Sequence, residues 1–227
     1  SIAKLVVPDY PIVGDLKITV KAMLEAIDNS ENEFNDYTNW VELLRDYREK
    51  EPLRYIDSNE VIKPQWPIQR VGKLLGAKAI ISTDVGQHQM WTAQFYPFSY
   101  PRQWITSGGL GTMGFGLPAA MGVARALKGT DKVSINFTGD GSILMNIQEL
   151  MTCVEYELPV INIILNNNYL GMVRQWQTMF YDNRLSETDL SAQPNFKMLM
   201  EAFGGLGYRV TTKEEFDAAL RDAVEKK

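Results

Sequence analysis

One carboxylate and a pair of amides each follow an apolar run in this sequence. Asp140 stands in the glycine turn of "VSINFTGDGS", and Asn166 and Asn167 close the run "VINIILNN". Ligands of a parallel α/β sheet bind at the carboxyl ends of its strands, so we expect these side chains to meet at one rim. Carboxylate and amide oxygens suit a hard divalent cation such as Mg²⁺, which keeps positions free for phosphate oxygens.

The residues next to Asp140 fit a diphosphate held through that cation. Gly139 and Gly141 carry no Cβ atom, so the backbone can come close to phosphate oxygens. Ser142 begins a predicted helix, whose free N–H groups favour an anion. A lone Gly-Asp-Gly is usually only a turn, and an Asn pair after a strand is usually only a loop. Their joint spacing, with a helix between them, predicts a metal-bridged diphosphate site.

A competing motif is "GLGTMG". Gly109, Gly111 and Gly114 match the dinucleotide fingerprint G-x-G-x-x-G, which would indicate a nicotinamide enzyme. That fingerprint needs a hydrophobic strand before it and an acidic residue at the end of the next strand. Here "YPRQWITSG" is a poor strand, and Asp131 lies on the wrong side of the strand that follows. The glycines are better explained as backbone packed around a ligand at a helix start.

The elements that must position these residues alternate between strands and helices. Strands are predicted over residues 79–83, 132–137, 159–165 and 208–212, and 84–91 is predicted to be a loop. Helices are predicted over residues 66–76, 118–129, 143–157, 170–180, 195–205 and 213–227, the last opened by a capping box from Thr212 to Glu215. Continuously apolar strands between helices indicate an α/β fold, a parallel sheet with helices on both faces.

The first part of the chain has a different character. A helix is predicted over residues 16–27, with an apolar stripe formed by Leu16, Val20, Met23, Leu24 and Ile27. Residues 28–60 are polar and acid-rich, and we interpret them as a linker with a short helix around Trp40 and a solvated charged face. The predicted division is therefore 1–27, 28–60 and 61–227.

Composition excludes several classes of protein. The 227 residues carry a net charge of −5, whereas nucleic-acid-binding proteins are normally basic. No apolar stretch reaches the roughly 18 residues of a membrane span, so no membrane partner is expected. The single cysteine, Cys153, cannot form an internal disulfide, which favours a reducing compartment such as the cytoplasm. The opening "SIAKLVVPDY" has neither an initiator Met nor a signal-like segment, and we interpret the chain as an excerpt.

Four blocks carry a family resemblance: "GQHQMW", "SGGLGTMGFGLPAAMG", "GDGSILMNIQEL" and "LNNNYLGMVRQWQ". Together they resemble the catalytic subunit of the acetolactate synthase (acetohydroxyacid synthase) family, over about residues 1–219. The resemblance implies a thiamine diphosphate-binding domain, truncated at its carboxyl end, after the tail of a central FAD-type domain. The implied reaction joins two pyruvates, or pyruvate and 2-ketobutyrate, with loss of CO₂. Its products are acetohydroxy acids on the route to valine, leucine and isoleucine.

The resemblance also implies roles for individual residues. The Mg²⁺ ligands would be the side chains of Asp140 and Asn167 and the backbone carbonyl of Tyr169. The residues implied to bind thiamine diphosphate are Gly86, Gln87, His88, Gly111, Thr112, Met113, Asp140, Gly141, Ser142, Asn167, Tyr169, Leu170, Gly171, Met172 and Val173. Among them, Met113 would be the apolar wedge beneath the cofactor, a role that a long unbranched thioether suits.

The substrate pocket implied by the resemblance consists of Met172, Val173 and Trp176, on the helix after the metal loop. FAD, which is structural in this family, would touch Gly14 and Asp15. Plain alternatives stand beside these roles: His88, the only histidine, can be a loop imidazole with a local hydrogen bond, and the helix face can be ordinary amphipathic surface.

The family's activating glutamate belongs to an amino-terminal domain that these residues do not contain, so no catalytic residue is assigned here. We expect no acetolactate formation by this chain alone. The resemblance implies a homodimer, whose active sites lie between subunits, and is compatible with a small regulatory subunit. We further expect an exposed apolar rim at Phe95, Tyr96, Phe98 and Tyr100, since large exposed apolar patches mark interfaces.

Other functions remain open at this point. A pyruvate oxidase, a glyoxylate carboligase or a related decarboxylase of the thiamine enzymes would share the Gly-Asp-Gly and Asn-Asn pattern, although "GMVRQWQ" points away from them. A non-catalytic interaction module that keeps the fold is a further alternative. Loss of cofactor binding in a folded sheet would favour it.

Overall fold

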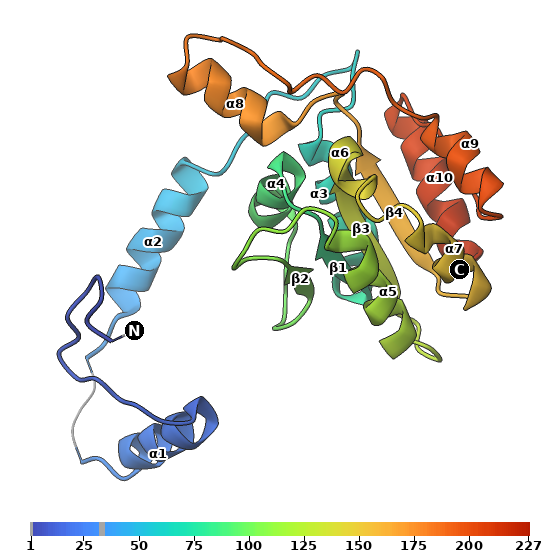
Figure 1. Ribbon diagram of the computed structural model, residues 1–227. Coiled ribbons are helices and arrows are strands. Elements are labelled where there is room, and N and C mark those ends of the chain that lie inside the picture. Colours follow the sequence, from blue (N-terminus) through green and yellow to red (C-terminus); the bar gives the residue numbers. More distant parts are fainter. Residues whose placement is uncertain (1, 32–34) are drawn as a thin grey trace. The chain divides into compact units, whose positions relative to one another are not determined.

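The computed structural model describes residues 2–31 and 35–227, which divide into two compact units between Pro52 and Leu53. The first unit contains α1 (Leu16–Asp28) and α2 (Thr38–Lys50), so both helices predicted here are confirmed (Figure 1). Neither of these two fully described helices has a buried residue, and the predicted apolar stripe of α1 is exposed. The boundary between the two units lies inside the predicted linker, residues 28–60. The ends of that linker stay a prediction.

The second unit is built on a parallel sheet, as predicted. Its strands are β1 (Ala79–Thr83), β2 (Trp104–Thr106), β3 (Val133–Gly139) and β4 (Val160–Leu165). Among the described residues the sheet has the order β2-β1-β3-β4, and every neighbouring pair is parallel. The chain leaves β1 toward β2 on one side and then crosses back to β3 on the other. The carboxyl ends of β1 and β3 therefore form the switch point where such folds bind ligands.

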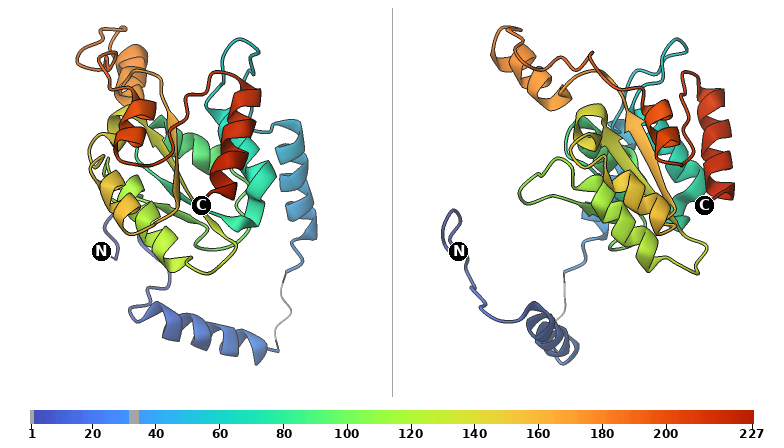
Figure 2. Two further views of the ribbon diagram at one scale, coloured as in Figure 1. Left: turned by 90° about the vertical axis from the view of Figure 1, so that its right-hand side faces the viewer. Right: turned by 45° about the vertical axis from the view of Figure 1, so that its right-hand side comes forward.

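Helices cover both faces of this sheet (Figures 1 and 2). The α-helices of the second unit are α3 (Gln65–Leu75), α4 (Gln87–Phe95), α5 (Gly116–Ala126), α6 (Asp140–Ile143), α7 (Glu149–Glu155), α8 (Gly171–Phe180), α9 (Phe196–Ala202) and α10 (Lys213–Glu225). On one face, α3 and α10 pack Ile68 and Phe216 into a core with Phe137 of β3. On the other face, α5 and α7 pack Leu117 and Leu150 into a second core.

The α5 face of β3 is polar, so the expectation of continuously apolar strands is wrong for this strand. Ser134, Asn136 and Thr138 alternate with apolar residues and are fully or almost fully buried. Ser134 Oγ donates to the carbonyl of Ala120 at 2.8 Å, and Asn136 Nδ2 donates to Asn162 Oδ1 at 2.8 Å. These hydrogen bonds offset part of the cost of burying polar groups between sheet and helix, while Asn136 Oδ1 has no partner among the described residues.

Three local expectations are wrong. Residues 84–91 are not all loop, because α4 begins at Gln87; its apolar residues form no stripe that would indicate a helix. Residues 143–157 are not one helix, because Asn146 interrupts them and donates through Nδ2 to the carbonyl of Gly114 at 2.7 Å. Residues 208–212 form no strand: Val210 packs on the α3–α10 core without pairing to β4.

The capping box at the start of α10 is confirmed, with Thr212 and Glu215 bonding each other's backbone N–H groups. The expected exposed aromatic rim is wrong. The hydroxyl of Tyr96, a buried residue, donates to the carbonyl of Gly76 at 2.9 Å, and Phe98 stacks on Trp104 with ring centroids 5.3 Å apart. These aromatic residues fill space beside β1 and β2.

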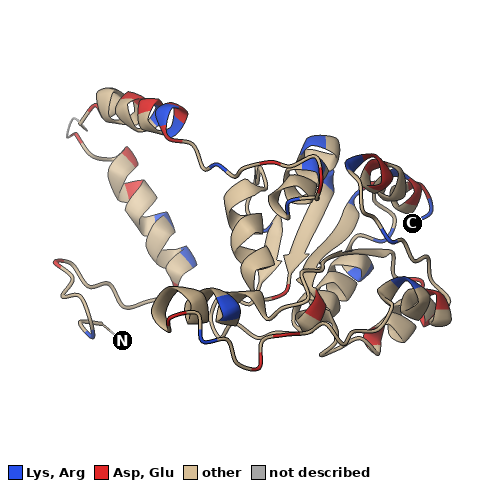
Figure 3. Cartoon of the chain, turned by 90° about the horizontal axis from the view of Figure 1, so that it is seen from above, with Lys and Arg blue, Asp and Glu red and all other residues tan. Residues whose placement is uncertain are grey.

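Charged residues lie on the helices and connecting segments, and the four strands carry none (Figure 3). Within the described ranges, no helix combines the length and the apolar character needed to cross a membrane. Strands without charge are expected in a sheet that helices cover on both faces.

Two glycines of α5 provide a matched test of the close approach between helix and sheet. A Cβ atom on Gly116 would lie 2.5 Å from Asn136 Oδ1 and 2.7 Å from the backbone nitrogen of Asp84, whereas one on Gly122 would meet nothing within 4 Å. We expect Gly116→Ala to lower the free energy of unfolding by about 1–3 kcal/mol through overpacking. Gly122→Ala should raise it by about 0.5–1 kcal/mol, the usual gain in a helix interior. Urea unfolding of the two variants checks this, and equal effects would contradict the close-packing account.

Candidate functional site

The carboxyl ends of β1, β3 and β4 form one continuous rim. The register pairs Gly139 at the end of β3 with Leu165 at the end of β4, so Asp140 and Asn166 leave the sheet next to each other. The end of β1 joins them through Ser142, whose Oγ donates to the carbonyl of Val85 at 3.0 Å. The structure thus gathers the polar ends of three strands at the switch point.

Asp140 is the buried charge of this rim, with only 2% of its surface exposed. Its Oδ1 accepts the backbone N–H of Gly141 at 3.1 Å, and its Oδ2 accepts from Gln193 Nε2 at 2.5 Å. The other end of the Gln193 amide, Oε1, accepts from Asn166 Nδ2 at 2.9 Å. Sequence reasoning missed Gln193, because it lies on the irregular segment between α8 and α9 and has no motif around it.

The asparagine loop folds back on itself. Asn167 Oδ1 accepts the backbone N–H of Tyr169 at 3.0 Å, and Asn168 between them has φ of +60°, a left-handed conformation that asparagine tolerates. Asn167 Nδ2 also points to Gln87 Oε1 at 3.5 Å. A Cβ atom on Gly171 would lie 2.1 Å from that same Gln87 oxygen, so glycine is what lets α4 and α8 approach here.

Met113, Gly141 and Leu170 meet beside Asp140. A Cβ atom on Gly141 would lie 3.0 Å from Leu170 Cδ2 and 3.9 Å from Met113 Cε. Met113 lies in the glycine-rich segment after β2, in which Gly111 and Gly114 have φ of +65° and +88°. Thr112, in the same segment, is exposed, and its backbone N–H donates to Ser107 Oγ at 3.0 Å.

His88 is buried in the first turn of α4 and is not a loop residue. Its ring packs against the end of β3, since a Cβ atom on Gly139 would lie 3.1 Å from Nδ1. Nε2 is buried and has no hydrogen-bond partner among the described residues. Desolvation lowers the pKa of His88 to about 4, and a hydrogen bond that the ring donates to the Asp84 backbone opposes this by a smaller amount. The imidazole is therefore neutral at pH 7.

Asp84 is a second buried carboxylate that sequence reasoning missed. Its Oδ1 accepts the backbone N–H of Gly116 at 3.1 Å, and its Oδ2 accepts from Thr138 Oγ1 at 2.9 Å. Burial raises the pKa of Asp84, and hydrogen bonds from the start of α5 and from Thr138 oppose that rise. One carboxylate thus joins the end of β1, the end of β3 and the first turn of α5. A polar residue closing the apolar run "AIIST" is the signal that could have identified it.

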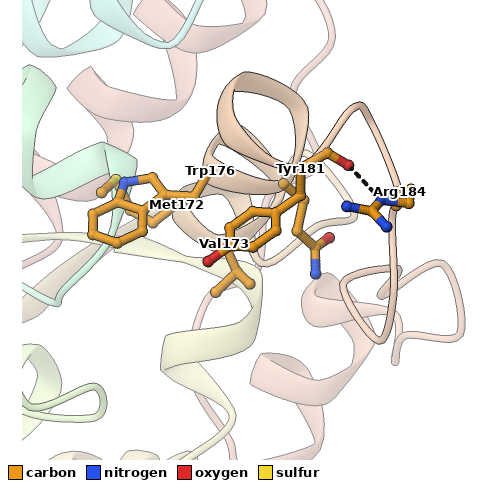
Figure 4. A pocket seen from close by; sticks show the side chains of 6 residues that line it. Met172, Val173, Trp176, Tyr181 and Arg184 are labelled. Atoms are coloured by element: carbon orange, nitrogen blue, oxygen red, sulfur yellow. Dashed lines mark hydrogen bonds between the residues drawn. The ribbon is translucent and has the colours of Figure 1, made fainter.

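The residues predicted for a substrate pocket lie together on α8. They border a hollow of about 640 Å³ lined by Met172, Val173, Trp176, Gln177, Tyr181 and Arg184 (Figure 4). Arg184 Nε donates to the carbonyl of Tyr181 at 3.1 Å, so two of the lining residues are joined. The lining combines apolar surface with one guanidinium group.

Gly14 and Asp15, predicted to touch FAD, lie in the first unit. Asp15 is the N-cap of α1, and its Oδ1 accepts the backbone N–H of Ile18 at 3.1 Å. This local bond accounts for an aspartate at that position. The FAD role stays a prediction.

Comparison with known proteins defines the class of this domain. Residues 84–227 match the family described as "Thiamine pyrophosphate enzyme, C-terminal TPP binding domain". This range begins directly after β1 and includes the ends of β3 and β4 and the glycine-rich segment. The chain belongs to this family of thiamine pyrophosphate enzymes.

The relatives compared individually are all acetolactate synthases. The chain is 45% identical over 227 residues to the acetolactate synthase isozyme 3 large subunit of Escherichia coli K12, covering 99% of this chain and 39% of that protein. It is 44% identical over 204 residues to the acetolactate synthase large subunit of Lactococcus lactis, covering 90% of this chain and 34% of the relative. Acetolactate synthase 3, chloroplastic, of Brassica napus is 42% identical over 233 residues, with 99% and 35% covered. The chain thus spans less than two fifths of the length of these curated relatives.

The single histidine gives a direct test of the buried rim. A pKa of about 4 in the folded state, against an ordinary value of 6.5, means that only the unfolded state takes up this proton between those values. The contribution of His88 to stability is therefore complete above pH 6.5 and decreases by roughly 3 kcal/mol as the pH falls toward 4. NMR titration should show one imidazole that stays neutral at pH 5. Denaturant unfolding of His88→Gln should depend less on pH over this range. A titration midpoint near 6.5 would contradict the burial.

Proposed function

We propose that this chain is the thiamine diphosphate-binding part of an acetolactate synthase catalytic subunit, which joins two 2-ketoacids with loss of CO₂. The observation that carries the proposal is the rim at the switch point. There a buried carboxylate, neutral oxygen donors, glycines without Cβ atoms and Met113 come together, with the hollow on α8 following directly in the chain. The similarity to acetolactate synthases over almost the whole chain supports the choice of reaction.

The donor set at the rim fits Mg²⁺. No group of three or more His, Cys, Asp or Glu that could hold a metal occurs in the part of the chain that the structure describes. The proposed ligands are one carboxylate, from Asp140, with the amide oxygen of Asn167 and the backbone carbonyl of Tyr169. Hard oxygen donors with a single negative charge suit Mg²⁺ that keeps positions for phosphate oxygens, and they do not suit a softer metal.

The residues around this donor set would hold the diphosphate and the rest of the cofactor. Gly141 and Ser142 follow Asp140, and Gly86, Gln87 and His88 come from the loop and helix after β1. The exposed backbone of Gly111 and Thr112 would complete the contact from the glycine-rich segment, and Leu170, Gly171, Met172 and Val173 would do so from the start of α8. Thiamine diphosphate, when bound, supplies carbanion chemistry, and the protein supplies position and electrostatics.

The hollow on α8 would receive the 2-ketoacid substrates. Met172, Val173 and Trp176 provide apolar contacts for the alkyl part of pyruvate or 2-ketobutyrate. Arg184 carries the positive charge that a carboxylate requires. This placement supports Trp176 as a residue that shapes the pocket for the second ketoacid.

Larger assembly features form part of the same proposal. The full protein would be a homodimer with FAD held by a central domain, reached here through Gly14 and Asp15. The relatives are named large subunits, which supports a second, smaller subunit with a regulatory role.

Burial raises the pKa of the Cys153 thiol to about 11, so this cysteine is unreactive. A lone thiol suits a reducing compartment, and we place the protein in the cytoplasm.

Charge at the rim can be tested by calorimetry of thiamine diphosphate binding, with Mg²⁺ and with a chelator. Asp140→Ala should weaken Mg²⁺-dependent binding by about 100-fold or more, since the diphosphate then faces the cation without its anionic ligand. Asn167→Ala should cost less, about 10-fold, because it removes a neutral oxygen. Asp131→Ala is the matched control: its exposed carboxylate precedes the opposite end of β3 and pairs with Lys78. Affinity that is equal in the wild type and Asp140→Ala, or unchanged by the chelator, would refute the metal-bridged site.

Met113 should have a separable effect in the same experiment. Met113→Ala removes apolar surface and no metal ligand. We expect the dependence of binding on Mg²⁺ to persist while the affinity for thiamine diphosphate falls by about 10-fold through lost packing. The affinity for inorganic diphosphate with Mg²⁺, measured alongside, should not change. A loss of diphosphate affinity in this variant would contradict the role as a wedge beneath the organic part of the cofactor.

A further inference from the structure

Gln193 is placed at the rim by a backbone connection that is independent of any ligand. The segment from Thr188 to Leu190 runs antiparallel to the asparagine loop and forms a bridge between Tyr169 and Asp189. The N–H of Leu170 donates to the carbonyl of Thr188 at 2.9 Å, and the N–H of Leu190 donates to the carbonyl of Asn168 at 2.8 Å. We call residues 188–193 the strap.

The strap delivers one side-chain amide between two strand ends. Gln193 Nε2 donates to Asp140 Oδ2 at 2.5 Å, and its Oε1 accepts from Asn166 Nδ2 at 2.9 Å. Both ends of the amide are used, and Gln193 is itself partly buried. The bond network Asp140–Gln193–Asn166 therefore links the tip of β3 to the tip of β4 and leaves Asn167 outside it.

We propose that Gln193 is a positioning residue for the divalent cation of the proposed function: it fixes the orientation of the Asp140 carboxylate. Each carboxylate oxygen has two lone pairs. Asp140 uses one on each oxygen, for Gly141 and for Gln193, and keeps one on each for the cation. The donor is a neutral amide, so the full negative charge of Asp140 remains for the metal. A lysine or arginine at this place would neutralise that charge.

An alternative arrangement, with Gln193 in the position of the cation, predicts the opposite change in metal affinity. If the Gln193 N–H occupied the place of the cation, removal of this side chain would strengthen metal binding. Hydrogen bonds to ligating carboxylates generally support the metal, and their loss typically weakens its binding about 10–100-fold. The measured direction of change therefore decides between the two arrangements.

The test measures Mg²⁺ affinity by calorimetry at a fixed concentration of thiamine diphosphate, for the wild-type chain, Gln193→Met and Ser191→Ala. Methionine keeps the length of glutamine without its hydrogen bonds. Ser191 lies on the same strap, and its side chain bonds only to Asp189 within the described contacts, which makes Ser191→Ala the matched control. Thermal unfolding in chelator shows whether either variant disturbs the fold without metal.

We expect Gln193→Met to bind Mg²⁺ about 10–100-fold more weakly and Ser191→Ala to bind within about twofold of the wild type. Mg²⁺ should also raise the unfolding temperature of Gln193→Met less than that of the wild type. Unchanged or tighter Mg²⁺ binding by Gln193→Met would overturn the proposal, as would an equal loss in Ser191→Ala. A wild-type chain that binds thiamine diphosphate equally well without Mg²⁺ would refute the metal-bridged site of the proposed function, and the role of Gln193 with it.

Discussion

The carboxylate of Asp84, buried among two strands and a helix, is the contact on which the rim depends. Removing a charge from water is costly unless hydrogen bonds replace the lost hydration. Asp84 meets that requirement with the N–H of Gly116 and the hydroxyl of Thr138, and the start of α5 brings further backbone N–H groups. These partners are available only when α5 approaches as closely as its first glycine allows. The glycine-rich segment before α5, and Met113 with it, is thereby fixed relative to the ends of β1 and β3.

Around Asp140, by contrast, the structure surrounds one negative charge with neutral amides. Gln193 bonds to Asp140, Asn166 bonds to Gln193, and Asn167 and Gln87 form a separate pair; none of these amides adds charge. The neighbouring imidazole of His88 is kept neutral by burial. A cation in this region would be attracted by the Asp140 carboxylate, and a diphosphate held by that cation would meet neutral amides beside it. The two buried carboxylates thus differ: one has all its partners within the fold, and the other keeps lone pairs for a ligand.

The sequence contained enough information for β1, β3 and β4 and for part of the candidate site, but not for β2, which lies in the run interpreted as a poor strand. Asp140 and Asn167 could be found because each closes an apolar run beside a local motif. Asp84 closes a similar run, yet no glycine turn surrounds it, and its partners lie far along the chain. Gln193 could not be predicted from the sequence for another reason. Backbone hydrogen bonds between the strap and the asparagine loop set its position, and no local sequence pattern encodes them. The mistaken strand over 208–212 shows the converse, because apolar alternation there serves packing without pairing.

The parallel sheet has a consequence for how the rim comes into being during folding. β1 pairs on one side with β2 and on the other with β3, and none of these pairs can be closed by a tight hairpin. Such non-local pairings form slowly. Until both β3 and α5 have docked, Asp84 has no partners and is more stable in water, so partly folded chains have no rim. Any ligand of the rim therefore binds only the completed sheet, and its binding energy stabilises the whole second unit rather than one loop.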